Sequence, residues 1–306
     1  MSVLENIFLD VRFKNPLVLP SGIIQEIPAH KRAVEAGAGG VVTKSLTVEP
    51  REGNSLPRVI KYEKIGYLNS VGLRNPGIQK GVGVVSNFIK SSDVPTIVSV
   101  FASNVGDFKI LAKEILTANP KLLELNLSCP NTIDELGVPL GIGVESTTEA
   151  VSAVKKIVGN KIKIIAKLSP NVQNIGEIAK AAEAAGADAI SAINTVGPGM
   201  IIDIERKRPI LGNLEGGVSG AAIKPIAIRC VYDIYRVVKI PILGLGGLSS
   251  WQDVVEMMLA GASLVGIGSA YYMNKNVYKE INKGLLEYAK ELKLSNLSEI
   301  VGAAHK

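Results

Sequence analysis

The residues best able to do chemistry gather in one short stretch, Leu122–Asn131, which reads Leu-Leu-Glu-Leu-Asn-Leu-Ser-Cys-Pro-Asn. Its first half is an apolar run interrupted by Glu124, which favours a buried or half-buried strand. Pro130 cannot donate to a sheet ladder, so the strand must end there. The strand end carries two amides, a hydroxyl and a thiol, at Asn126, Ser128, Cys129 and Asn131. It therefore offers hydrogen-bonding groups and one possible base, Cys129, although a turn with an inert cysteine would give the same pattern.

The elements that must position these groups alternate along the chain. Eight segments have a strand pattern, at 17–20, 40–43, 96–100, 122–127, 162–167, 189–193, 242–243 and 264–267. Helical patterns alternate with them, at 29–37, 78–89, 107–117, 148–158, 175–185, 221–238, 251–260 and 276–290. Eight strand-to-helix units in a chain of 306 residues predict an α/β fold, the (β/α)₈ or TIM barrel. A doubly wound open sheet is the alternative, which the lack of a Gly-x-Gly-x-x-Gly after the first strand disfavours.

We expect residues 1–306 to form a single barrel domain, with a short hairpin or lid at 1–16 ahead of the main body. Three long segments punctuated by Gly or Pro interrupt the alternation, at 46–80, 132–146 and 197–218. Long loops in compact domains are usually functional. We therefore expect these insertions at the C-terminal face of the strands, where ligands bind in parallel α/β folds.

Composition and charge narrow the function classes. Hydrophobic residues make up 47% of the chain and aromatic residues 5%, which suits a large α/β core. The net charge of +6 is dispersed, so nucleic acid is not the favoured partner. The two cysteines form no disulfide framework and point to a reducing, cytoplasmic compartment. Cys230 lies in a helical pattern, and we expect it to be structural. We expect no signal peptide, no membrane span (which needs about 18 apolar residues) and no metal site.

Polar groups and glycines follow nearly every predicted strand. They are Ser21-Gly22, Lys44-Ser45, Ser103-Asn104, Asn126 to Asn131, Lys167, Asn194-Thr195, Gly246-Gly247 and Gly268-Ser269. In a barrel these positions converge on one face. The glycine pairs let backbone N–H groups approach a phosphate closely. Lys44 and Lys167 end buried strands, so each needs an anionic partner, either a ligand or an acidic side chain.

Six motifs resemble the dihydroorotate dehydrogenase family. They lie at 43–54, 69–77, 126–131, 216–220, 244–250 and 260–269. The similarity covers nearly the whole chain and is to the soluble class 1 enzymes, which use a cysteine base where the membrane-associated class uses serine. The resemblance implies oxidation of dihydroorotate to orotate in pyrimidine biosynthesis, with a proton removed by Cys129 and a hydride transferred to non-covalent FMN. Val71 departs from the methionine or isoleucine more frequent there, and 23–28 is less typical of the family.

The resemblance also implies residue roles. Flavin contacts are implied for Ser21, Gly22, Lys44, Ser45, Asn126, Lys167, Gly217, Ser219, Gly246, Gly247, Gly268 and Ser269. Substrate contacts are implied for Lys44, Asn69, Gly72, Leu73, Asn126, Asn131, Asn194 and Thr195. Asparagine amides both donate and accept, so several of them can read the alternating N–H and C=O groups of such a substrate. Lys167 would stabilise negative charge on the reduced flavin.

The strings at 73–77, 222–227 and 249–253 look most like the partnered class 1B form. This implies a homodimer that carries an electron-transfer subunit with FAD and an iron–sulfur cluster. The chain itself has neither a cysteine cluster nor a nicotinamide-binding glycine motif. The alternatives are a dihydropyrimidine dehydrogenase-like enzyme, a dihydrouridine synthase, a flavin-free phosphate-binding isomerase and an inactive scaffold barrel.

Overall fold

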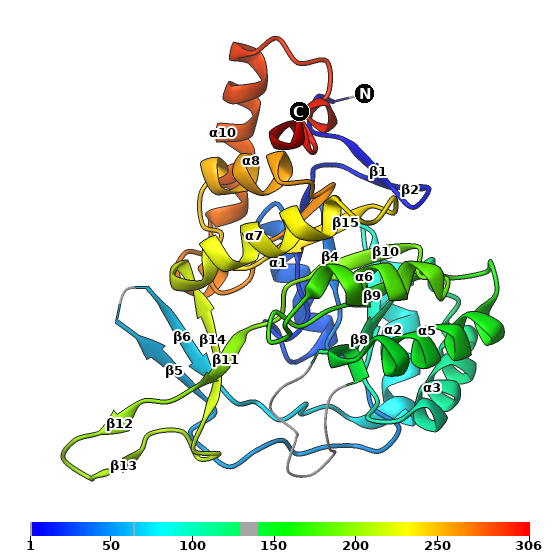
Figure 1. The fold of residues 1–306 in the computed structure, drawn as a ribbon, viewed down its shortest axis with the longest axis vertical. Helices are drawn as coiled ribbons and strands as arrows, with labels where there is room; N and C mark the ends of the chain where they lie inside the picture. Colours follow the sequence, from blue (N-terminus) through cyan, green and yellow to red (C-terminus); the bar gives the residue numbers. More distant parts are fainter. Residues whose placement is uncertain (1, 64, 129–139) are drawn as a thin grey trace.

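A closed barrel of eight parallel strands forms the centre of the computed structural model, which describes residues 2–63, 65–128 and 140–306 (Figure 1). The strands are β3 (Leu17–Leu19), β4 (Gly40–Val42), β7 (Thr96–Val100), β8 (Leu122–Asn126), β9 (Lys163–Lys167), β10 (Ala189–Ala192), β15 (Ile242–Leu245) and β16 (Leu264–Gly266). Each pairs with the barrel strands before and after it in the chain, and β16 closes the ring on β3. The predicted (β/α)₈ barrel is confirmed.

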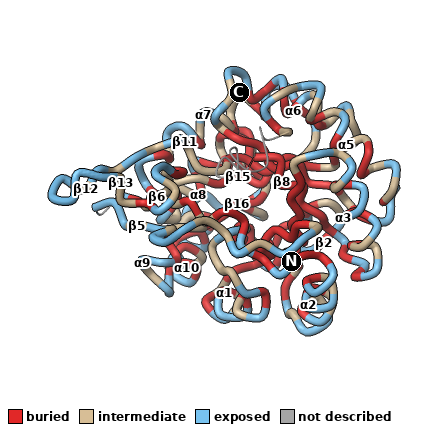
Figure 2. Tube along the Cα trace, turned by 90° about the horizontal axis from the view of Figure 1, so that it is seen from below, coloured by how far each residue is buried: buried red, intermediate tan, exposed pale blue. Residues whose placement is uncertain are grey.

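The helices surround this barrel, and Figure 2 shows buried residues along the strands with exposed residues on the surrounding helices. They are α1 (Lys31–Glu35), α2 (Gly77–Ser91), α3 (Val105–Ala118), α5 (Val144–Val158), α6 (Ile175–Ala184), α7 (Lys224–Tyr235), α8 (Trp251–Leu259), α9 (Ala270–Met273) and α10 (Val277–Glu291). Side chains alternate in direction along each strand. On β8, Leu123 and Leu125 pack in the large outer core, whereas Leu122 packs in the barrel interior. Glu124 and Asn126 share the inward direction of Leu122.

Local side chains explain where several helices begin. Asn104 accepts a hydrogen bond from the Asp107 N–H and caps α3, and Asn174 caps α6 in the same way. Two predicted helices begin differently. The expected helix at 29–37 is a 3₁₀ turn, η1 (Ile27–His30), followed by α1. The helix expected from 221 likewise starts as a 3₁₀ turn, η3 (Ala221–Ile223), before α7.

The N-terminal hairpin packs against the N-terminal end of the barrel. Strands β1 (Asn6–Phe8) and β2 (Val11–Phe13) are antiparallel, and Phe8 and Phe13 belong to the interior core that includes Leu122. The Asn6 amide donates to the Ser263 carbonyl, just before β16, at 2.7 Å. The hairpin therefore closes the end opposite to the ligand face, and it is not a lid over that face.

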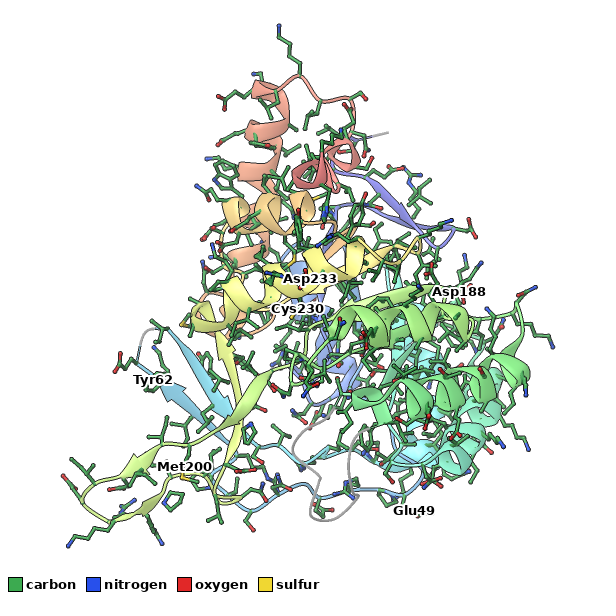
Figure 3. The ribbon with its side chains drawn as sticks, viewed as in Figure 1. Glu49, Tyr62, Asp188, Met200, Cys230 and Asp233 are labelled. Carbon is green, nitrogen blue, oxygen red and sulfur yellow. The ribbon has the colours of Figure 1, made fainter. Side chains whose placement is uncertain are left out.

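Two of the predicted loops are partly sheet, which corrects the expectation for 46–80 and 197–218. Strands β5 (Val59–Tyr62), β6 (Gly66–Asn69), β11 (Val196–Gly199) and β14 (Gly216–Gly220) form one antiparallel sheet, and β12 (Ile202–Asp203) pairs with β13 (Arg208–Pro209). These strands project from the barrel as an arm, which carries Tyr62 and Met200 (Figures 1 and 3). Of the predicted loop at 132–146, residues 132–139 lie outside the described part, and α5 begins at Val144.

No helix in the described ranges is long and apolar enough to cross a membrane.

Candidate active site

Two adjoining pockets open at the C-terminal ends of the barrel strands. The glycine pocket is lined by Pro20, Ser21, Ile23, Lys167, Ile193, Asn194, Thr195, Ser219, Ile223, Leu245, Gly246, Gly247, Leu248, Gly266, Gly268 and Ser269. The amide pocket is lined by Ser21, Gly22, Lys44, Ser45, Asn69, Val71, Gly72, Leu73, Asn126, Lys167, Asn194 and Thr195. The pockets share Ser21, Lys167, Asn194 and Thr195, so ligands bound in the two would lie next to each other.

All but three of the residues implied by the family resemblance line these two pockets. Gly217 lies in β14, whose partner β6 carries Asn69, and it lines neither pocket. Cys129 and Asn131 lie outside the described residues. Most of the predicted strand-end groups are therefore brought together at one face. Ser103-Asn104 is the exception, because it lines neither pocket and Asn104 caps α3 instead.

The glycine pocket presents backbone donors that lack protein acceptors. Among the described residues, the N–H groups of Gly247, Gly268 and Ser269 donate to no protein acceptor. Gly247 has φ +78°, and a Cβ there would lie 2.6 Å from the Lys224 backbone nitrogen, so only glycine fits. Three such residues in the lining of one pocket suit an oxyanion such as a phosphate.

Two buried lysines line the amide pocket, and one of them, Lys167, also lines the glycine pocket. Lys44 and Lys167 are 6% and 4% exposed. The Lys167 Nζ donates to Ser21 Oγ at 3.0 Å, and within the described ranges it forms no ion pair. A buried ammonium group is stable only with compensating negative charge or several acceptors. The site is therefore electrostatically suited to an anionic ligand.

Two asparagine amides are held in defined orientations in the amide pocket. Asn126 Nδ2 donates to Ser45 Oγ at 3.2 Å, and its Oδ1 accepts from Ser128 Oγ at 3.0 Å. Asn194 Nδ2 donates to Ser128 Oγ at 2.9 Å and to its carbonyl at 3.1 Å, while its Oδ1 accepts from the Thr195 N–H. A side-chain amide has two N–H donors and an oxygen with two lone pairs. Asn126 therefore has one N–H left to donate to a ligand, and Asn194 has one oxygen lone pair left to accept from it. The pocket can thus bind a group that offers a carbonyl and an N–H.

Gly217 supports the amide pocket from behind. Its carbonyl accepts a hydrogen bond from Asn69 Nδ2 at 3.2 Å. A Cβ on Gly217 would lie 2.0 Å from Thr195 Oγ1, so β14 approaches Thr195 as closely as a glycine allows. Gly217 therefore fixes the positions of Asn69 and Thr195 without lining either pocket.

Sequence reasoning missed an apolar wall and a buried polar layer. The wall consists of Pro20, Ile23, Ile193, Ile223, Leu245 and Leu248. All of these except Ile223 directly precede or follow the polar strand ends, so a search of strand-end positions of every residue type would have found them. The polar layer is Ser99 and Glu124, which hydrogen-bond to each other at 2.9 Å beneath Ser45. Their inward direction follows from strand alternation, a signal that was present in the sequence.

Cys230 lies on the outer helix α7, together with Asp233, and lines neither pocket (Figure 3). Burial raises the pKa of its thiol to about 11. A thiol with so high a pKa is protonated at neutral pH and is a poor nucleophile. This agrees with the structural role expected from the sequence.

Comparison with known proteins gives consistent matches. The family model described as dihydroorotate dehydrogenase matches residues 3–288. Three curated relatives share the name "Dihydroorotate dehydrogenase B (NAD(+)), catalytic subunit". The relative from Pyrococcus horikoshii is 44% identical over 99% of this chain and 98% of its own length. The relative from Methanosarcina mazei is 42% identical over 97% of this chain and 93% of its own length. The relative from Thermoanaerobacter pseudethanolicus is 40% identical over 96% of this chain and 96% of its own length.

Proposed function

The chain belongs to the dihydroorotate dehydrogenase family of oxidoreductases, and from this premise we propose that it oxidises dihydroorotate to orotate on a bound FMN, with Cys129 as general base. The observation that carries the proposal is the pair of joined pockets. One offers unpaired backbone N–H groups, and the other offers oriented amides beside two buried lysines. Such a pair of pockets suits a phosphorylated cofactor next to a small anionic ring.

The residues present fit FMN. Family membership implies a flavin. Gly247, Gly268 and Ser269 would hold the phosphate, because their N–H groups have no protein acceptor in the described ranges. Lys167 would contact the flavin ring and oppose negative charge on it, since its ammonium group is buried without an ion pair there. When bound, FMN supplies the acceptor for the hydride that leaves C6 of dihydroorotate.

The remaining residues bind the substrate and take its proton. The free Asn126 N–H would donate to a ring carbonyl of dihydroorotate, and the free Asn194 lone pair would accept from a ring N–H. Lys44 would attract the substrate carboxylate. Cys129 directly follows Ser128, whose hydroxyl contacts both amides. As general base, Cys129 would take the proton from C5, so that proton and hydride together account for the two hydrogens lost.

The electron acceptor for the reduced protein is proposed to be a partner subunit. Several relatives are named NAD(+)-linked catalytic subunits, a name that implies a second subunit in those complexes. This chain has only two cysteines, fewer than the four thiolates of a usual iron–sulfur cluster. FAD and the cluster would therefore belong to the partner, which would serve a homodimer of this chain. The arm exposes the apolar side chains of Met200 and Ile204, 51% and 85% exposed, which suits a protein interface.

The proposal is tested by the cofactor and product of the purified chain. Denaturation should release about one FMN per chain, and turnover with dihydroorotate and an artificial dye acceptor should yield orotate. A protein that stays colourless after incubation with FMN would refute the cofactor. A flavoprotein that oxidised another dihydropyrimidine but not dihydroorotate would refute the substrate.

A further inference from the structure

A buried carboxylate beneath the amide pocket is not used by the proposed mechanism. Glu124 lies on β8, points into the barrel and is 1% exposed. Glu124 Oε1 accepts a hydrogen bond from Ser99 Oγ at 2.9 Å. Burying a carboxylate in a barrel interior is costly, and an apolar residue would fill the same volume. The hydrogen bonds that Glu124 makes therefore indicate what the buried carboxylate does.

Glu124 ends a continuous chain of hydrogen bonds that reaches the pocket. From Ser99 Oγ the chain passes to Ser45 Oγ at 2.9 Å, and from Ser45 Oγ to Asn126 Nδ2 at 3.2 Å. It continues from Asn126 Oδ1 to Ser128 Oγ at 3.0 Å, and from there to Asn194 Nδ2 at 2.9 Å. We call this set of six residues the relay: Glu124, Ser99, Ser45, Asn126, Ser128 and Asn194.

A carboxylate at one end gives every bond of the relay one direction. A carboxylate only accepts, so the single Ser99 hydroxyl proton points at Glu124. Ser99 can then only accept from Ser45, and the Ser45 oxygen must accept from the Asn126 amide. The Asn126 carbonyl is consequently turned to Ser128, whose own oxygen accepts from Asn194. The bond to Ser45 thus favours the same Asn126 orientation as the Ser128 N–H, which donates to Asn126 Oδ1 at 3.3 Å. Asn194 is oriented separately, by the Ser128 carbonyl and the Thr195 N–H.

We propose that Glu124 is a positioning residue, which fixes the direction of the Ser99 and Ser45 hydrogen bonds and so helps to hold the Asn126 amide with an N–H toward the pyrimidine ring. This inference rests on the proposed function. Without the acceptor, the Ser99 hydroxyl turns to Ser45, and Ser99 no longer holds the Ser45 proton away from Asn126. The bond from Asn126 Nδ2 to Ser45 Oγ is weakened, and the amide that donates to the ligand is then held mainly by its oxygen's bonds from Ser128.

The test compares three relay variants by their affinity for orotate, titrated through the visible spectrum of the bound flavin. Glu124→Leu removes the acceptor and should weaken orotate binding about tenfold, the value of one or two net hydrogen bonds. Glu124→Gln keeps an acceptor oxygen and should remain within about threefold of the parent. Ser99→Ala frees the Ser45 proton and should weaken binding about fivefold. Recovery in the glutamine variant separates loss of the acceptor from loss of charge.

Thr96→Val is the matched control. Thr96 shares β7 with Ser99 and is buried, but its hydroxyl has no partner in the described part of the chain. By strand alternation it points away from the barrel interior. This variant should bind orotate as the parent does.

Three results of these titrations would overturn the inference, and a fourth would overturn the proposed function. Parent-like orotate affinity in Glu124→Leu with FMN retained would overturn the inference, as would equal weakening in the leucine and glutamine variants. If Glu124→Leu does not fold, parent-like affinity in Ser99→Ala overturns it instead. A parent protein that carries FMN but does not bind orotate would overturn the proposed function itself, and the inference with it.

Discussion

Replacing Gly217 by alanine tests the geometry of the amide pocket most severely. The added Cβ would lie 2.0 Å from Thr195 Oγ1 and 2.6 Å from Thr195 Cβ, so more than a hydroxyl rotation is needed. Gly217 is also held by its pairing with Asn69 and by the hydrogen bond from that side chain. Overpacking of this kind costs about 1–3 kcal/mol. If Thr195 moves to relieve the overpacking and the full cost falls on the binding site, orotate should bind roughly 5- to 150-fold more weakly.

The assay is orotate titration of the FMN-bound protein, together with its thermal unfolding midpoint. Gly83→Ala is the matched control, because no heavy atom lies within 4 Å of the added Cβ and the residue sits within α2. Alanine there should leave orotate binding unchanged and stabilise the helix by up to about 1 kcal/mol. Gly217→Ala with parent-like orotate affinity and an unchanged midpoint would refute the close approach of β14 to Thr195.

Four further outcomes are expected. Cys129→Ala should retain FMN yet slow flavin reduction by dihydroorotate by about 10²–10⁴. Cys129→Ser should recover part of that lost rate at high pH. A wild-type rate in Cys129→Ala would show that another group is the base. Lys167→Met should weaken FMN binding by at least about tenfold in equilibrium dialysis, and undiminished affinity would remove Lys167 from the flavin site. Because burial raises its pKa to about 11, Cys230 should resist iodoacetamide at pH 8 and react as the pH rises, so rapid labelling at pH 8 would contradict its burial. The isolated chain should reduce NAD only when an electron-transfer subunit is added, and fast, saturable fumarate reduction by the chain alone would contradict the partnered assignment.

The barrel was predictable from the sequence because its determinants are local. A buried strand such as 122–127 and the helix that follows each leave a periodic pattern, and strict alternation of the two leaves few topologies. Helix starts were less accurate where the chain enters through a 3₁₀ turn, as at Ile27–His30.

The arm was not predictable, because its strands are made by pairing between distant segments. Gly217 pairs with Asn69 across the sheet, and the glycines that permit this close packing look locally like loop residues. Polar strand ends such as Lys167 and Asn194 were found because they stand out against apolar strands. Glu124 was noticed only as an interruption of an apolar run. It lies two residues before Asn126 on the same strand, however, so strand alternation already places both side chains on the same face.

The central claim is that dihydroorotate passes its hydride to FMN in this chain while Cys129 takes the proton. The most direct measurement is a single turnover without oxygen, in which oxidised protein is mixed with dihydroorotate in a stopped-flow spectrometer and the flavin absorption is followed. The account predicts complete loss of the oxidised flavin spectrum, one orotate per flavin, and a much slower reaction in Cys129→Ala. A flavin that stays oxidised in the presence of excess dihydroorotate would contradict it.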